Sequence, residues 1–203
     1  MDPLFGKVTV FLSLLLFIRI RWPHGNRIKD LPVNEDRQDG LEVGLLTGAT
    51  IGTVLIPILW ITTSLFDFAE YPLHPVAFGI GVAIALWGLW LFDCSHRDLG
   101  TLWSPTLRLR EEHQLVAIGI YRKIRHPMYA AMFLLAVAQI LFLPNWFVGP
   151  TYLLTFGLLY LLRVGREERM MLDRFGAEYE AYMKQTGRLF PTASPGETGS
   201  NGV

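Results

Sequence analysis

The sequence of 203 residues has only one cysteine, Cys94, which excludes an internal disulfide framework. It also lacks a G-x-G-x-x-G motif after a strand pattern and a G-x-x-x-x-G-K-[ST] motif. If the chain binds a nucleotide-like cofactor, it must therefore bind it by a structure other than a Rossmann fold or a P-loop. The five histidines are scattered without metal-ligand spacing, and we predict no metal site. The formal net charge is zero, and we expect no nucleic-acid partner.

Charge is also absent from long stretches of the chain. Five apolar segments stand out, and the last four contain no charged side chain; the segments are residues 4–20, 43–66, 75–92, 127–143 and 146–162. Each is about long enough to cross a ~30 Å hydrocarbon layer as a helix. The pattern predicts an all-α integral membrane protein with five transmembrane helices.

The basic residues alternate between the gaps. Of the 18 lysines and arginines, 16 lie in gaps that would share one side of the membrane, and Arg19 lies at the segment end next to one of these gaps; Lys7 is the exception. The positive-inside tendency therefore predicts an N-terminus outside and a C-terminus in the cytoplasm. Lys7, Ser13 and Arg19 interrupt the first segment, and a signal peptide is the alternative there. The absence of an A-x-A site argues against that alternative.

Small residues and proline mark features within these segments. Gly44, Gly48 and Gly52 recur every four residues, which predicts a helix face that another helix approaches closely, in the same chain or in a second copy. Pro57 predicts a kink. The Pro144-Asn145 break predicts a tight antiparallel hairpin between the last two spans.

The polar parts of the chain are predicted to gather on the cytoplasmic side. Residues 93–125 are predicted to form a loop, with residues 106–110 and 114–118 as an extended hairpin or an irregular cap. The last helix is expected to continue out of the bilayer to Gly176. We predict one domain over residues 1–191 and a disordered tail over residues 192–203.

Two clusters could carry chemistry. Arg125-His126-Pro127-Met128-Tyr129 begins the fourth span, with His126 at an N-cap whose free N–H groups attract anions, or it merely secures the helix at the interface. Arg163 and Glu167 are four residues apart beside Glu168, and they form either a weak surface ion pair or part of a polar cavity. Cys94 is either a small apolar residue at a helix end or a nucleophile activated by His96.

Taken in order, the motifs resemble the isoprenylcysteine carboxyl methyltransferase family. They are Leu115-Val116-x-x-Gly119-Ile120-Tyr121, Arg125-His126-Pro127-Met128-Tyr129, Glu167-Glu168, Phe175-Gly176-x-x-Tyr179-x-x-Tyr182 and Gly187-Arg188-Leu189-Phe190-Pro191. The resemblance covers residues 93–191, about half of the chain.

The resemblance implies an integral membrane enzyme that takes a methyl group from S-adenosylmethionine and releases S-adenosylhomocysteine. The cofactor pocket would be formed by the last spans, the cytoplasmic loop and the helical extension. The implied cofactor contacts are His113, Gln114, Leu115, Val116, Tyr121, His126, Pro127, Met128, Tyr129 and Glu167. Arg163 matches the position that engages the acceptor carboxylate, which makes Arg163 and Glu167 the implied catalytic pair. A further family contact falls on Thr106, where the residue type differs.

The expected reaction is carboxyl O-methylation of a lipophilic acceptor of the prenyl-cysteine type. A carboxylate is already ionised at neutral pH, so no general base is needed. The alternatives are a phospholipid or other amine N-methyltransferase, in which Glu168 or His126 would serve as base, and a sterol-type membrane reductase that uses NADPH. A non-catalytic scaffold or transporter is a third alternative. We expect a lipophilic or prenylated substrate, contact with membrane lipid and an active site that faces the cytoplasm, in a bacterial or archaeal inner membrane or the endoplasmic reticulum.

Overall fold

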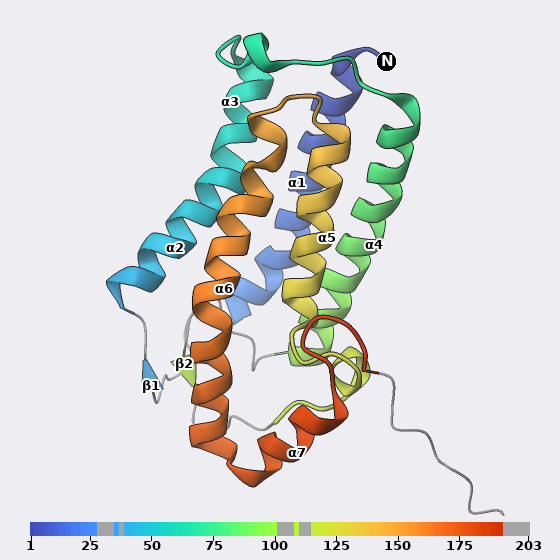
Figure 1. The fold of residues 1–203 in the computed structure, drawn as a ribbon. Coiled ribbons are helices and arrows are strands. Elements are labelled where there is room, and N and C mark those ends of the chain that lie inside the picture. Colours follow the sequence, from blue (N-terminus) through green and yellow to red (C-terminus); the bar gives the residue numbers. More distant parts are fainter. Residues whose placement is uncertain (28–34, 37–38, 101–107, 110–114, 193–203) are drawn as a thin grey trace, which may run out of the picture.

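The computed structural model describes residues 1–27, 35–36, 39–100, 108–109 and 115–192, and within them the fold is a bundle of helices (Figure 1). The helices are α1 (Pro3–Arg27), α2 (Gly40–Thr50), α3 (Ile56–Thr62), α4 (Pro75–Leu99), α5 (Pro127–Phe142), α6 (Val148–Phe175) and α7 (Ala177–Gln185). Strands β1 (Glu35–Asp36) and β2 (Arg108–Leu109) pair antiparallel. For residues 106–110 and 114–118 the sequence predicted a hairpin or an irregular cap; the hairpin is wrong, because β2 pairs with β1, and residues 106–107, 110 and 114 lie outside the described residues.

Each predicted apolar segment lies mainly within a helix, but several boundaries differ. α1 continues past residue 20 to Arg27, and α4 continues to Leu99, so the first seven residues of the predicted loop are helical. The second segment leaves its helix at Thr62, four residues before its predicted end.

Four of these helical segments are long and apolar enough to cross a membrane: α1, α2–α3, α4 and α6. α5 has 16 residues, about 24 Å at 1.5 Å per residue, and falls short of that length. A fifth span is therefore not confirmed.

The second apolar segment contains an irregular turn. A π-helical turn, Ile51–Leu55, joins α2 to α3, and Pro57 is the second residue of α3. Proline has no N–H to donate, so regular α-helical hydrogen bonding cannot continue through this position. Gly52, inside the turn, meets α6: Thr151 Oγ1 donates to the Gly52 carbonyl at 2.9 Å. A side chain at Gly44 or Gly48 would meet nothing within 4 Å, so the close packing predicted for the glycine face is present only at Gly52.

The predicted hairpin of the last two apolar helices is confirmed. Asn145 lies between α5 and α6 with 1% of its surface exposed. Its Oδ1 accepts hydrogen bonds from the N–H groups of Phe147 and Val148, both at 3.0 Å, and its Nδ2 donates to the Phe66 carbonyl at 2.7 Å. The side chain thus supplies a cap to the first turn of α6 and ties it to the segment after α3.

α6 continues beyond the other helices, as the sequence predicts. It ends at Phe175, and Gly176 has φ 52°, a conformation that favours glycine and turns the chain into α7. Figure 1 shows α7 folded back beside the projecting part of α6. We call this the charged end of the bundle: α1 and α4 end there, α5 begins there and α6 projects from it. The predicted disordered tail, apart from Thr192, lies outside the described residues.

Gly52→Ala is expected to lower the free energy of unfolding by about 1–3 kcal/mol, because the new Cβ would lie 2.9 Å from the Thr151 carbonyl oxygen and closer still to the Thr155 side chain. Gly44→Ala in the preceding helix α2 is the matched control and is expected to be neutral or slightly stabilising, since its Cβ enters open space. Thermal unfolding in detergent measures both variants. Equal stability of the two would contradict the close approach of the π-helical turn to α6.

Candidate active site

A cavity of about 320 Å³ lies at the charged end of the bundle. α1, α2, the π-helical turn, α5 and α6 form its walls, together with a short 3-10 turn, Gly119–Arg122. Its polar lining consists mainly of Arg21, Tyr121, Arg125, His126, Tyr129, Arg163 and Glu167. Its apolar lining includes Leu46, Val54, Met132, Phe156 and Leu159. One chamber thus joins a polar end to an apolar end.

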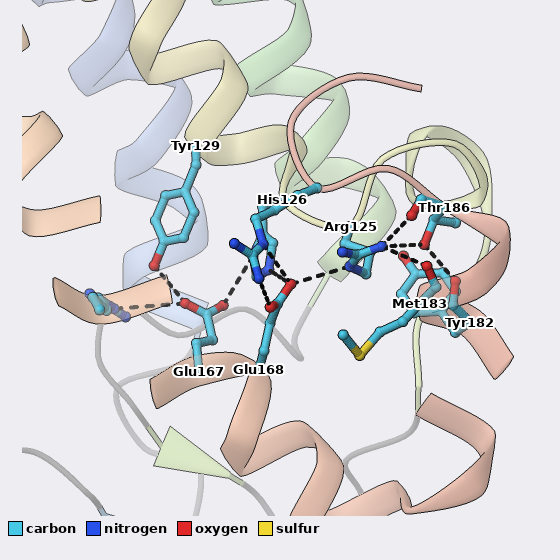
Figure 2. Close-up of polar contacts among 10 residues, drawn as sticks. Arg125, His126, Tyr129, Glu167, Glu168, Tyr182, Met183 and Thr186 are labelled. Atoms are coloured by element: carbon cyan, nitrogen blue, oxygen red, sulfur yellow. Dashed lines mark hydrogen bonds and ion pairs between the residues drawn. The ribbon is translucent and has the colours of Figure 1, made fainter. Parts of the chain in front are cut away.

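Two residues from neighbouring helices form the centre of the polar lining. The Tyr129 hydroxyl on α5 donates to Glu167 Oε2 on α6 at 2.5 Å (Figure 2). Arg163 precedes Glu167 by one helical turn, and its Nε lies 3.8 Å from the same oxygen. The ring of His126 stacks beside Tyr129, with 5.4 Å between the ring centroids. The two clusters named from the sequence therefore meet at one site.

Arg163 has a second acidic neighbour, Glu42, from the first turn of α2. Glu42 Oε1 lies 3.5 Å from Arg163 NH1, and the two side chains are 2% and 8% exposed. Three residues earlier, Asp39 accepts two hydrogen bonds from Arg166, the shorter at 2.7 Å. The hydrogen bonds from Arg166 hold the pKa of Asp39 below its usual value. Two acid–base pairs at matching spacing thus join α2 to α6.

Glu168 forms a second polar centre next to the first. Its carboxylate is buried and accepts from Arg125 Nε at 3.2 Å and from Arg188 Nε at 3.1 Å. His126 Nε2 lies 3.3 Å from the same carboxylate. Figure 2 shows Glu167 and Glu168 turned toward different partners, with His126 between them. One carboxylate therefore joins α6, the start of α5 and the C-terminal segment.

Backbone hydrogen bonds fix that C-terminal segment beside the start of α5. The Arg125 N–H donates to the Gly187 carbonyl at 2.8 Å, and the His126 N–H donates to the Arg188 carbonyl at 3.0 Å. Arg125 also donates to the Met183 carbonyl at 2.9 Å and to the Thr186 carbonyl (Figure 2). The last of the sequence motifs, residues 187–191, therefore holds Arg125 and His126 in place through its backbone.

Tyr121 closes one side of the cavity. The Tyr182 hydroxyl on α7 donates to the Tyr121 carbonyl at 2.6 Å, and the Asp98 carboxylate accepts from the N–H of Ile120 at 2.8 Å. Burial raises the pKa of the Tyr121 phenol, and the negative charge of Glu167 raises it further. The Tyr121 phenol is therefore neutral at neutral pH.

The structure brings together most of the residues predicted for the site. Tyr121, His126, Met128, Tyr129, Arg163 and Glu167 line the cavity. Pro127 is fully buried at the first position of α5, and Leu115 and Val116 are half-buried but are not among the lining residues. His113, Gln114 and Thr106 lie outside the described residues.

The sequence did not reveal two residues near Arg163. Arg21 lines the cavity from α1, and Glu42 contacts Arg163 from α2. Neither lies in a motif. The sequence does carry one signal for Glu42: Asp39 and Glu42 are three residues apart at the start of α2, and Arg163 and Arg166 are three residues apart on α6, which runs antiparallel to α2. Of the two residues in the Cys94–His96 alternative, His96 has its Nδ1 3.0 Å from the Phe92 carbonyl oxygen, and Cys94 Sγ contacts Arg97.

Comparison with known proteins points to one family. Residues 74–173 match the model of the isoprenylcysteine carboxyl methyltransferase (ICMT) family. A protein-S-isoprenylcysteine O-methyltransferase of Tribolium castaneum is 34% identical over 80 residues, which cover 39% of this chain and 28% of that protein. A human protein of the same name is 33% identical over 85 residues, which cover 42% of this chain and 28% of that protein.

A solved structure of the eukaryotic intramembrane Ras methyltransferase ICMT shares the fold. The TM-score is 0.59 at 21% identity, covering 92% of this chain and 67% of that one. The family model and the curated relatives confirm the resemblance predicted from the motifs. This chain covers less than a third of the length of the two curated relatives described above.

Glu168→Gln is expected to lower the free energy of unfolding by roughly 2–4 kcal/mol, because it leaves the buried Arg125 guanidinium without its carboxylate. Arg169→Gln is the matched control, since Arg169 is the adjacent exposed residue on α6 and should be within about 0.5 kcal/mol of the wild type. Chemical or thermal unfolding in detergent measures both. Equal stability of Glu168→Gln and Arg169→Gln would show that Glu168 does not hold the segments together.

Proposed function

We propose that this chain transfers a methyl group from S-adenosylmethionine to the carboxylate of a lipophilic acceptor of the prenyl-cysteine type. The observation that carries the proposal is the single cavity in which Arg163 and Glu167 meet apolar walls formed by long apolar helices. A carboxylate head group needs a cation, and a prenyl tail needs an apolar path. The names of the curated relatives agree with this acceptor class.

The residues around the polar end fit S-adenosylmethionine. Its ribose hydroxyls and ammonium group are donors, and Glu167 is a carboxylate acceptor in the cavity wall. The stacked rings of His126 and Tyr129 provide a flat surface for an adenine ring. The volume of about 320 Å³ lies at the lower end of the usual range of small-molecule pockets. His113, Gln114, Leu115, Val116 and Pro127 complete the contact set that the resemblance implies.

S-adenosylmethionine supplies, when bound, an electrophilic methyl group on a positively charged sulfur. The chain supplies position. Arg163 holds the acceptor carboxylate in the cavity, and Glu167 is held one turn away by the Tyr129 hydroxyl at 2.5 Å. The apolar wall excludes water from the acceptor oxygen, and orientation together with desolvation contributes several kcal/mol. No residue has to remove a proton, because the acceptor is already an anion.

The surroundings of Glu168 favour a carboxylate acceptor over an amine. An ammonium acceptor must lose a proton before it can react, so an N-methyltransferase needs a base. Glu168 is held by Arg125, Arg188 and His126 and is therefore poorly placed to take up a proton. His126 shares the same carboxylate. The site thus suits an acceptor that arrives ionised.

The arrangement in the membrane is part of the same proposal. Residues 1–191 form one methyltransferase domain with five spans, the short α5 included, an outer N-terminus and a cytoplasmic charged end. The cofactor enters from the cytoplasm, and S-adenosylhomocysteine leaves by the same way. The acceptor tail enters from the bilayer between α1 and α2, whose residues Phe17 and Leu46 both line the cavity.

Arg163→Ala and Glu167→Ala are each expected to cut methyl transfer at least tenfold while the protein remains folded, because the first removes the carboxylate-binding cation and the second a cofactor contact. Transfer of radiolabelled methyl groups to a small prenyl-cysteine mimic measures the effect. Arg169→Gln, on the exposed face of α6, is the matched control. Near-normal turnover in both alanine variants would refute the assigned roles.

Direct binding separates the methyltransferase from a reductase. Detergent-purified protein is expected to bind radiolabelled S-adenosylmethionine and not NADPH, with binding weakened in Glu167→Ala. Binding of NADPH alone would reject the proposed function.

A further inference from the structure

The guanidinium of Arg163 is shared between two carboxylates in the wall of the cavity. Glu42 Oε1 lies 3.5 Å from NH1, and Glu167 Oε2 lies 3.8 Å from Nε. Glu167 belongs to the same helix and is tied to Tyr129, so it is part of the cofactor side of the site. Glu42 comes from α2, is 1% exposed and is not among the residues that line the cavity. It therefore reaches Arg163 from behind the cavity wall.

This placement affects how strongly Arg163 can bind an acceptor. Charges interact more strongly at buried positions than in water, and both Glu42 and Arg163 are buried. The negative charge of Glu42 offsets part of the positive charge that an acceptor carboxylate meets at Arg163. Acceptor binding in the wild type is accordingly weaker than a lone buried arginine would give.

The same offset affects the rate of the proposed reaction. As the oxygen–methyl bond forms and the carbon–sulfur bond breaks, the electron pair stays on sulfur and the acceptor carboxylate loses its negative charge. Its attraction to Arg163 is therefore stronger before the reaction than in the transition state. An interaction that is stronger in the ground state raises the barrier to reaction.

We propose that Glu42 is a positioning residue that attenuates Arg163, so that the acceptor carboxylate is oriented without being held too tightly to react. This inference rests on the proposed function and adds a residue outside the motifs to it. Glu42 acts through Arg163 and does not touch the acceptor.

The second pair between α2 and α6 supplies a control. Asp39 and Arg166 join the same two helices three residues away, but the Asp39 side chain is 50% exposed and its partner is not Arg163. Asp39 also caps α2 by accepting from the N–H of Glu42 at 2.9 Å. Asparagine caps helices as well as aspartate does, so Asp39→Asn removes the charge pair and keeps the cap.

The test is steady-state methylation of a prenyl-cysteine mimic by the full chain in detergent. Glu42→Gln is expected to lower the KM for the acceptor and kcat together, each by roughly threefold to tenfold, so that kcat/KM changes little. Inhibition by the uncharged methyl ester product is expected to stay within about twofold of the wild type, since the ester offers Arg163 no charge. Asp39→Asn is expected to change neither constant.

Glu42→Asp covers the case in which the glutamine variant does not fold. It keeps the charge but withdraws it from Arg163, and the same paired fall in KM and kcat is expected at smaller size. A purely structural role for Glu42 would lower the melting temperature without lowering KM. Suppose that the wild type methylates the acceptor, but Glu42→Gln raises KM or leaves both KM and kcat unchanged within about twofold. That result would overturn this inference and leave the proposed function standing. A wild type that methylates no carboxylate acceptor would reject both.

Discussion

The buried carboxylate of Glu168 is the interaction on which the site depends. It joins Arg125 at the start of α5, Arg188 in the C-terminal segment and α6 itself. Removing a charge from water is costly, and the cost is recovered only when hydrogen bonds satisfy the group. Three segments that are distant in the sequence are therefore held together at one point. The position of His126 and of the cavity beside it follows from that junction.

The neighbouring carboxylate of Glu167 takes a different role because its surroundings differ. It is 29% exposed and faces the cavity, whereas Glu168 is 6% exposed and faces the support behind the site. Adjacent residues on a helix point about 100° apart. One turn of α6 can therefore place Glu167 in the cavity wall and Glu168 against Arg125 and Arg188. The pair of glutamates in the sequence thus divides into one residue that lines the cavity and one that holds segments together behind it.

The sequence predicted the parts of this protein that follow from local patterns. Apolar runs, four of them without any charge, located the apolar helices, and Pro144-Asn145 located the hairpin. The ends of α1 and α4 were missed because their last turns are polar and leave no mark in hydropathy. The contact of Glu42 with Arg163 was missed because it joins residues 121 positions apart, and the matching three-residue spacings of the two acids and the two arginines do not by themselves identify α2 and α6 as neighbours. The pairing of β1 with β2 was missed for the same reason.

The unbroken course of α6 constrains how this chain can change. The helix runs from Val148 to Phe175 and carries Phe156 and Leu159 in the apolar wall before Arg163 and Glu167 in the polar one. Inserting or deleting one residue between them would turn the later side chains by about 100° and shift them by about 1.5 Å along the axis. Exposed apolar positions such as Leu158 can accept other apolar residues, but an indel inside this helix would turn Arg163 and Glu167 away from the cavity. At the exposed positions of α6, the number of residues between the apolar wall and Arg163 therefore matters more than which apolar residues fill those positions.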